Sequence, residues 1–448
     1  MSRAHPLQDA VDLLNTLQTP YAALVKRRSE GFIVDKTANE QTRKLLTRIG
    51  YSVISPDLHF RLSLTLQQQA DLSKLNIVHV AGTKGKGSTC AYVDSILSQY
   101  REARSIALKT GLFTSPHLIA VRERIRINSV PLSRELFAKY FFEVWDAMGD
   151  VEKPFYFRYL TLMSYHVFIR EGVDVTISEV GLGGEYDATN IVERPMVTGI
   201  SSLGIDHTYT LGNTIEEIAW HKAGIQKEGC PSFTVTQLPS AMKVVENRAK
   251  ERRVEAFKVV GEDQRLKGVE IRPDASFQRL NASLAIVLAE TVLGKLDPNF
   301  YQSRDILSKD FIEGLEKVVW RGRFEKKIEG NITWYLDGAH TAESIDVASK
   351  WFGEESSKKY VTLNDPTLFE VFDTAQDWKE STHIQPTRRS RVDVPSYKSA
   401  YSHQNSKNRQ IRPRDILSCI QSHRYSVKER YSLFYFIPYP CSHVYQTS

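Results

Sequence analysis

The feature that most constrains this sequence is an apolar run that leads directly into a glycine-rich turn with two lysines. Residues 77 to 90 read Ile-Val-His-Val-Ala-Gly-Thr-Lys-Gly-Lys-Gly-Ser-Thr-Cys. Gly82, Gly85 and Gly87 can adopt backbone angles that direct successive N–H groups at phosphate oxygens. Apolar residues then recur at helical spacing over residues 90 to 100, which adds the positive end of a helix. This order of elements predicts a loop that holds a triphosphate.

Within this loop, Lys86 would reach the terminal phosphates, and Ser88 or Thr89 would contact a magnesium ion or a phosphate. The general nucleotide motif has Ser or Thr directly after Gly-Lys, whereas Gly87 intervenes here. A flexible surface turn is the alternative interpretation.

Length and composition are those of an ordinary soluble protein. A chain of 448 residues is expected to form about two or three domains. It contains no apolar run near the roughly 18 residues of a membrane span, and its N-terminus lacks a secretory apolar core. Four scattered cysteines have neither disulfide nor zinc spacing, which favours a reducing compartment. Cys90 is either a reactive thiol or, as we expect, a small buried residue.

The net charge of +6 does not indicate a nucleic-acid surface. From residue 355 onward there are 14 Lys and Arg against 9 Asp and Glu, so this part carries +5 of the total. The preceding 354 residues are therefore near neutral, and no nucleic-acid partner is expected.

Between residues 75 and 235, strand-like runs alternate with helical patterns, which is typical of a mostly parallel sheet covered by helices. Such sheets bind ligands beyond the carboxyl ends of their strands. A helix is expected over residues 281 to 293. The expected strands cover residues 77–80, 105–108, 173–180, 196–203, 232–235 and 332–336.

The composition changes near residue 354. All 24 glycines lie at or before Gly353, and none occurs in the last 95 residues, where average usage of about 7% would supply six or seven. A disordered tail and a wrongly predicted exon or shifted reading frame are the two explanations, and we favour the second.

Four further segments carry groups suited to a magnesium–nucleotide centre. A hydroxyl-rich turn at residues 110 to 117 can supply ligands to a hard cation. The arginines that follow it, Arg122, Arg124 and Arg126, either face an anionic substrate or form the solvated side of a strand.

The second segment places Glu179 within a hydrophobic strand, where a lone carboxylate is unfavourable unless a cation balances it. The third ends a strand with Gly-Ile-Asp-His at residues 204 to 207, and His207 is either a ligand or a structural histidine. The fourth is a helix with a Thr214–Glu217 capping box. Its Lys222 is either functional or the cationic end of the helix.

Together these segments resemble the eukaryotic folylpolyglutamate synthases of the Mur ligase superfamily over residues 10 to 352. The resemblance implies an α/β fold in which a Mur-ligase-like P-loop ATPase domain precedes a Rossmann-like domain that is truncated or aberrant after about residue 353. We expect residues 1–300 to bind ATP and folate, 301–353 to begin the glutamate-ligase domain, and 354–448 to be a divergent tail. The matching motifs are GTKGKGS at 82–88, GLFTSPHL at 111–118, EVGLGGEYDATN at 179–190, GIDHT at 204–208, HKAGI at 221–225 and LDGAHT at 336–341.

The resemblance also implies roles for individual residues. Lys86, His207 and Lys222 are the expected catalytic residues, and Lys222 is expected to carry a carbamate. The segment at 155–160 is similar to the folate side of the family's site, although a buried helix face explains its aromatic residues equally well. Arg321 stands where the family usually has Pro. The expected magnesium ligands are Ser115, Glu179, His207 and Lys222, and the expected nucleotide contacts are Gly82, Thr83, Lys84, Gly85, Lys86, Gly87, Ser88, Asn281, Arg323, Asp337 and His340.

The implied reaction is ATP-dependent addition of L-glutamate to the γ-carboxylate of a reduced folate through an acyl phosphate, with Mg²⁺ and a possible monovalent cation. A dihydrofolate synthase, a nucleotide switch of the phosphate-loop class and an inactive folate- or nucleotide-binding remnant are the alternatives. The resemblance further implies a monomer, located in the cytoplasm and in some cases in mitochondria.

Overall fold

A large mixed sheet forms the centre of the first of two compact units. The computed structural model describes residues 5–19, 35–52, 70–329, 332–339, 342–360 and 431–436. Unit 1 comprises Met1–Val319 with Ser442–Ser448, and unit 2 comprises Trp320–Cys441. In unit 1 the strand order is β10-β9-β8-β3-β7-β4-β5-β6. The strands are β3 (Val78–Ala81), β4 (Thr110–Phe113), β5 (Ile125–Ile127), β6 (Val130–Pro131), β7 (Val175–Glu179), β8 (Val197–Ile200), β9 (Ser232–Val235) and β10 (Phe257–Val260).

The six strands from β10 to β4 are parallel, and β5 and β6 are antiparallel additions at one edge. All residues of β3, β7 and β8 are buried, as expected for parallel strands covered on both faces. The predicted α/β class with a mostly parallel sheet is confirmed. Two short strands, β1 (Tyr51–Ser52) and β2 (Ala70–Asp71), form a separate parallel pair.

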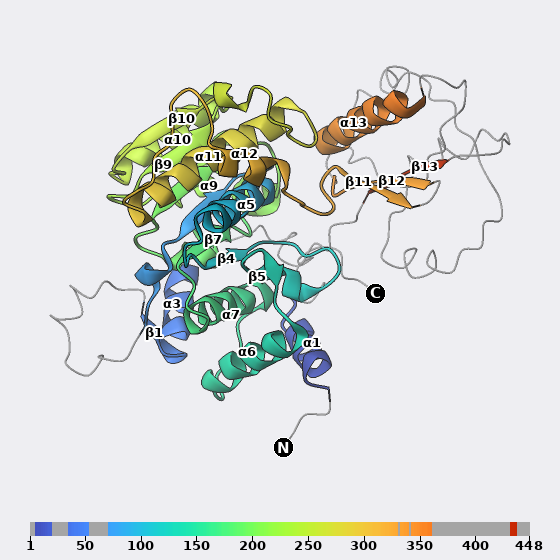
Figure 1. Ribbon diagram of the computed structural model, residues 1–448. Helices are drawn as coiled ribbons and strands as arrows, with labels where there is room; N and C mark the ends of the chain where they lie inside the picture. The colour runs from blue at the N-terminus through green and yellow to red at the C-terminus, as the bar shows by residue number, and fades with distance from the viewer. Residues whose placement is uncertain are drawn as a thin grey trace. The chain divides into compact units, whose positions relative to one another are not determined.

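Helices cover this sheet (Figure 1). Helix α5 (Lys86–Arg104) packs against β3, β4 and β7, and also contacts α11 (Ser276–Leu296) and α12 (Lys309–Glu316). A second layer packs around α7 (Tyr156–Arg170), and its aromatic residues contribute to a large apolar core. The remaining helices are α1 (Pro6–Thr16), α3 (Ala38–Arg48), α6 (Arg134–Ala147), α8 (Thr208–Leu211), α9 (Ile215–Ala223) and α10 (Pro239–Glu251), with 3-10 turns η1 (Leu72–Leu75), η2 (Val121–Arg124), η3 (Ala188–Ile191) and η4 (Gln264–Leu266).

One predicted strand was wrong, because residues 105 to 108 form the C-cap of helix α5 and the irregular chain that follows it. Ser105 caps the helix with a left-handed φ of 52°, and the N–H of Ile106 donates to the Arg101 carbonyl at 3.3 Å. The strand begins only at Thr110, so it includes the first part of the segment that we expected to be a turn. An apolar run of only a few residues is ambiguous, which is why periodicity did not separate the end of the helix from the start of a strand.

Unit 2 contains a three-stranded sheet of β11 (Glu325–Glu329), β12 (Ile332–Asp337) and β13 (Tyr431–Phe436), together with α13 (Ala342–Tyr360). β11 is antiparallel to β12, and β13 is parallel to it. A small core packs Tyr335 against Trp351 and Phe352. After residue 353, regular structure is thus present in the end of α13 and in β13.

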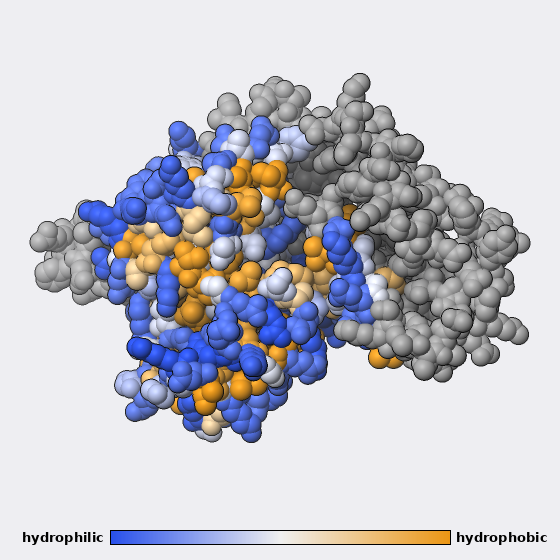
Figure 2. All heavy atoms as spheres, turned by 90° about the horizontal axis from the view of Figure 1, so that it is seen from above, coloured by the Kyte–Doolittle hydropathy of each residue, from blue (hydrophilic) through white to orange (hydrophobic). Residues whose placement is uncertain are grey.

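The described surface mixes hydrophilic and hydrophobic residues, as Figure 2 shows for one face. Large exposed apolar side chains include Ile119, Tyr209, Tyr301 and Val319. No helix within the described ranges is long and apolar enough to span a membrane.

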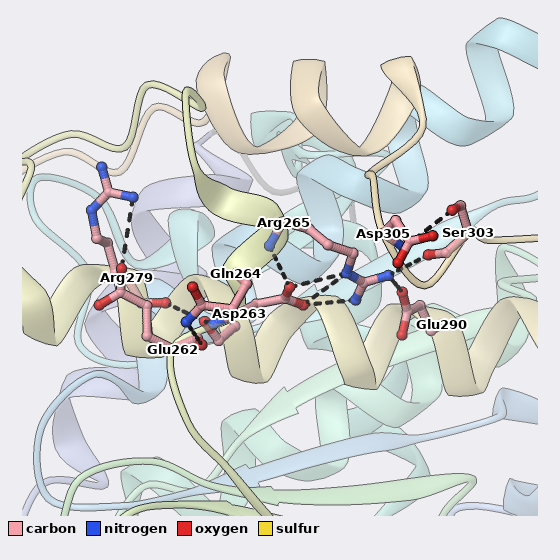
Figure 3. Close-up of polar contacts among 9 residues, drawn as sticks. Glu262, Asp263, Gln264, Arg265, Arg279, Glu290, Ser303 and Asp305 are labelled. Atoms are coloured by element: carbon pink, nitrogen blue, oxygen red, sulfur yellow. Dashed lines mark hydrogen bonds and ion pairs between the residues drawn. The ribbon is translucent and has the colours of Figure 1, made fainter.

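A buried arginine joins three segments at the end of unit 1 (Figure 3). The Arg265 guanidinium donates to Asp263 Oδ2 at 2.7 Å, to Glu290 Oε1 on α11 at 2.8 Å and to the Ser303 carbonyl at 3.0 Å. The side chains of Arg265, Asp263 and Glu290 are 12%, 14% and 24% exposed. This ionic cluster therefore ties the chain after β10 to α11 and to the chain before α12.

Replacing Arg265 by Met is expected to lower the stability of unit 1, because it leaves two largely buried carboxylates without their partner. We expect a loss of about 2 to 3 kcal/mol in the free energy of unfolding, measured from the urea midpoint and slope. The control is Arg272→Met, because Arg272 forms an exposed pair with Glu270 that is worth less than about 1 kcal/mol. Equal effects of the two substitutions would contradict this prediction.

Candidate functional site

The glycine-rich loop between β3 and α5 is shaped by two close approaches that exclude a side chain. Gly82 has a φ of 148°, and a Cβ there would overlap the hydroxyl of Ser201. Gly85 has a left-handed φ of 86° at the N-cap of α5, and a Cβ would overlap the Asn281 amide. Only glycine fits both the angles and the space at these positions.

Residues that directly follow β8 hold this loop through hydrogen bonds. The N–H groups of Thr83 and Lys84 donate to the Ser202 carbonyl at 2.8 and 3.1 Å. The Ser201 hydroxyl donates to the Lys84 carbonyl at 2.7 Å, and the Thr83 hydroxyl both donates to and accepts from the backbone of Gly204 at 3.0 Å. We did not predict these contacts from the sequence, because serines after a strand carry no signal of their own.

The amides of Lys86, Gly87 and Ser88 form the first turn of α5. The first N–H groups of an α-helix have no carbonyl four residues earlier within the helix to accept them. With the helix dipole they make a site for an anion. The strand, loop and helix thus follow one another as the sequence predicted, and phosphate binding by the loop stays a prediction.

Three lysines lie around the loop. Lys86 Nζ is 3.5 Å from the Thr83 carbonyl, and Lys84 Nζ is 3.3 Å from Asp206 Oδ2. Lys222, in the last turn of α9, is only 3% exposed and donates to the Gly82 carbonyl at 2.9 Å. Burial, and then the nearby Lys86, lower the pKa of Lys222 well below its ordinary value. Lys222 thus reaches the glycine-rich loop, and a functional role for it stays a prediction.

Glu179 and Ser115, two of the four expected magnesium ligands, lie together. Glu179 is 5% exposed at the carboxyl end of β7, where it pairs with Val80 of β3. Its Oε2 accepts the backbone N–H of Ser115 at 2.8 Å. Val80 is two residues before Gly82, whose carbonyl accepts the hydrogen bond from Lys222. Glu179 and Lys222 therefore approach the same end of β3.

His207 has a different environment from the other expected ligands. Its side chain is 43% exposed, and its Nε2 lies 4.0 Å from Asp206 Oδ1. It precedes the short helix α8 with a φ of 53°. The described residues contain no group of three or more His, Cys, Asp or Glu that could hold a metal ion. A ligand role for His207 stays a prediction.

Arg124 does not lie on the solvated side of a strand, so that alternative was wrong for this residue, and its contact with an anionic substrate stays a prediction. It ends η2 and is 1% exposed. Its Nε donates to His117 Nδ1 at 2.8 Å, and its guanidinium lies 5.5 Å from the Tyr156 ring centre. Burial lowers the pKa of His117 to about 3, so this ring is neutral. Arg124 Nη1 is buried and has no hydrogen-bond partner among the described residues.

The aromatic segment that begins α7 lies against the loop after Glu179. Tyr156 and Tyr159 are buried, as the helix-face interpretation requires. Phe157 contacts Phe113 with ring centres 5.7 Å apart, and a Cβ on Gly181 would overlap the Phe157 ring. The start of α7 thus packs into the core and also lies against the loop that follows Glu179.

Two other expectations concern α5 and α11. Cys90 is fully buried, and burial raises the pKa of its thiol well above the ordinary value, so it is an inert core residue. Asn281 is 3% exposed and donates to Gln278 Oε1 at 2.9 Å. Gln278 thereby orients the amide beside Gly85, a role that sequence reasoning missed.

The other predicted nucleotide contacts belong to unit 2. Arg323 Nη1 donates to the Gly322 carbonyl at 2.8 Å, and Asp337 Oδ2 at the end of β12 accepts the Phe324 N–H at 2.8 Å. His340 lies outside the described residues. The proposed contacts of these three residues with a nucleotide stay predictions.

Comparison with known proteins identifies related sequences. No protein-family model matches the chain. A folylpolyglutamate synthase of Neurospora crassa is 56% identical over 368 residues, which cover 80% of this chain and 66% of that protein. One of Candida albicans is 43% identical over 381 residues, which cover 78% of this chain and 70% of that protein.

A solved complex of FPGS with AMPPCP and folate is similar in fold, with a TM-score of 0.61 at 22% identity over 95% of this chain and 98% of that chain. The chain spans 66% and 70% of the lengths of the two curated relatives. On the match to the Candida albicans protein, the chain belongs to the folylpolyglutamate synthase family.

Proposed function

We propose that this chain is an ATP-dependent ligase that adds L-glutamate to the γ-carboxylate of a folate. The observation that carries the proposal is the meeting of a phosphate loop, the buried Lys222 and the buried Glu179 at one end of β3. The names of the curated relatives, and the bound AMPPCP and folate of the solved FPGS complex, support it.

The loop geometry fits the phosphates of ATP. The first turn of α5 offers backbone amides that lack an acceptor within the helix, and Gly82 and Gly85 let the loop approach Ser201 and Asn281 closely. Lys86 begins the helix, where its ammonium group would neutralise the β- and γ-phosphates. Asn281, held by Gln278 against the loop, is proposed to contact the nucleotide.

Glu179 and Ser115 fit a magnesium ion that keeps several waters and phosphate oxygens, because such sites need only one or two protein ligands. When bound, Mg²⁺ neutralises developing charge on the transferred phosphoryl group. Glu179 would supply a carboxylate oxygen and Ser115 a hydroxyl. His207 is proposed as a further ligand from the loop after β8.

Lys222 is proposed to carry a carbamate. Its buried amine would attack carbon dioxide, form an N–C bond and release a proton. The product replaces a cation beside Lys86 and Lys84 by an anion, which relieves the repulsion among three lysines. Burial of Lys222 favours the neutral amine that this step requires.

Arg124 and the start of α7 are proposed to receive the folate. The unpartnered Nη1 of Arg124 would bind a carboxylate of the glutamate tail, and Tyr156 and Phe157 would contact the apolar part of the substrate. The γ-carboxylate oxygen then attacks the γ-phosphorus of ATP, forming an acyl phosphate and releasing ADP.

The amine of free L-glutamate next attacks the acyl carbon. An amide bond forms, the C–O bond to phosphate breaks, and inorganic phosphate leaves with loss of the amine proton. Arg323, Asp337 and His340 are proposed as contacts to nucleotide or amino acid. The proposal includes residues 1–300 as the ATP- and folate-binding domain, a monomeric state, and location in the cytoplasm and mitochondria.

The first test measures ADP release with ATP, Mg²⁺, a reduced folate and L-glutamate, omitting each in turn. We expect release only when both acceptor substrates are present, with a product longer by one glutamyl residue in mass spectrometry. Release with dihydropteroate instead of folate would indicate a dihydrofolate synthase. Release that ignores both substrates would indicate a nucleotide switch, and no release with retained folate binding would indicate a remnant.

Lys86→Ala is expected to lower the rate of ADP release by at least about 100-fold, because it removes the positive charge nearest the reacting phosphate. The fold should persist in circular dichroism, since Lys86 is not part of the core. Lys243→Ala on the exposed side of α10 is the matched control and should change the rate less than about twofold. Comparable losses in both variants would contradict the assigned role.

Lys222 is testable by ¹³C NMR of the protein in ¹³C-labelled bicarbonate, which detects a carbamate without any substrate. We expect one slowly exchanging carbamate signal that disappears in Lys222→Ala and remains in Lys109→Ala. Lys109 is a partly buried lysine that pairs with Glu171, so it controls for non-specific modification. A signal that survives Lys222→Ala would rule out this assignment.

A further inference from the structure

Glu185 lies in the loop after β7, in backbone contact with the last turn of α9. Its N–H donates to the His221 carbonyl at 2.7 Å. A Cβ on Gly184 would lie 2.6 Å from the same carbonyl and 2.9 Å from that of Lys222. A Cβ on Gly224 would lie 2.5 Å from Glu185 Cα. The loop and the helix end therefore approach as closely as two backbones can.

The Glu185 carboxylate extends from this contact to α10, where two arginines bind it. Arg252 Nη2 donates to Oε1 at 2.6 Å, and Arg248 Nη2 donates to Oε2. The Arg248 side chain is 4% exposed. Arg248 also binds the exposed Glu251 through Nη1 at 2.8 Å. One carboxylate thus joins the loop to two cations of a different helix.

Aromatic contacts connect the same cations back to α9. The Arg248 guanidinium lies 4.5 Å from the centre of the Trp220 ring. Tyr186 places its ring 6.3 Å from that of Trp220 and 6.0 Å from that of His221. Since Trp220 and His221 immediately precede Lys222, the loop, α10 and the turn that carries Lys222 form one packed assembly.

The amide of Asn190 completes this assembly. Its Nδ2 donates to the carbonyls of Glu185 and Gly224, each at 3.0 Å. Asn39 on α3 donates to the Glu185 carbonyl at 2.8 Å. The backbone of Glu185 therefore makes three hydrogen bonds: its N–H donates to the His221 carbonyl, and its carbonyl accepts from Asn190 and Asn39. These bonds fix the loop beside the helix end.

We propose that Glu185 is a positioning residue for Lys222: by neutralising Arg248 and Arg252 it holds the end of α9 where Lys222 Nζ meets the phosphate loop. The proposal deepens the proposed function and rests on it, because it takes Lys222 as the carbamate-bearing residue. Reacting groups misplaced by about 1 Å can lose about 100-fold in rate. The hydrogen bonds of Glu185 go to His221, to two asparagines and to two arginines, so its action on Lys222 is indirect.

The test compares Glu185→Gln with Glu251→Gln in the full chain. Both substitutions remove a carboxylate that binds Arg248, but only the first removes the link to the loop. Amide hydrogen exchange of unliganded protein is expected to accelerate at least about tenfold in residues 218–225 of Glu185→Gln, with α5 unchanged. The Lys222 carbamate signal should fall at least about fivefold at the same bicarbonate concentration. Glu251→Gln should stay within about twofold of wild type in both measurements.

Arg252→Gln serves where Glu185→Gln fails to fold, because it removes one partner from a half-exposed position and retains the Arg248 pair. It should give an intermediate acceleration confined to the same residues. Uniform acceleration across unit 1, or an effect of Glu251→Gln as large as that of Glu185→Gln, would mean a merely structural role and overturn the proposal.

The wild-type protein separates this proposal from the proposed function. Absence of a carbamate signal in wild type would contradict the role of Lys222, while the exchange contrast would still show whether Glu185 holds the end of α9. A wild-type signal that Glu185→Gln leaves intact, with exchange unchanged, would overturn the positioning role and leave the proposed function standing.

Discussion

The contact between Lys222 Nζ and the Gly82 carbonyl is the interaction on which the site depends. A buried ammonium group is unfavourable unless its charge and its donors are balanced. Here burial and the nearby Lys86 lower the pKa of Lys222 well below its ordinary value, and its amine donates to a backbone carbonyl at the start of the phosphate loop. The contact fixes the distance between α9 and β3, two elements that are 140 residues apart in sequence. It thereby brings an ionisable amine to the point where phosphates are expected.

Close backbone approach is the means by which the fold keeps these elements in place. Gly82 leaves room for Ser201, Gly85 for Asn281, and Gly184 for the carbonyls of α9. Each contact joins a loop at the carboxyl end of the sheet to a neighbouring element, so the loops constrain one another. These glycines set the spacing between the loops and their neighbours. The ion pairs of Glu185 with Arg248 and Arg252 add to contacts that are already close.

Much of this arrangement was predictable because it is local in sequence. The strand, glycines and helix from residue 77 to 100, and the capping box of Thr214 and Glu217, follow patterns that span a few residues. The burial of Arg124 was not predictable, since it depends on His117 and Tyr156 meeting in space. Ser201 and Gln278 were missed for the same reason. Long-range packing, which single-sequence periodicity cannot report, decides these positions.

The two units differ in how much of the proposed chemistry their described residues can support. In unit 1, the glycine-rich loop after β3, the buried Glu179 at the end of β7 and the buried Lys222 of α9 meet at one end of the sheet, where the phosphoryl transfer is proposed. In unit 2, β12 ends at Asp337 and pairs with β13, which lies 94 residues later. A parallel pair requires a crossover connection, and glycines are absent from the chain between these strands after Gly353. In the proposed reaction, recognition of glutamate is thus assigned to the part of the sequence whose composition is least like that of an ordinary α/β domain, and activation of the folate carboxylate to unit 1.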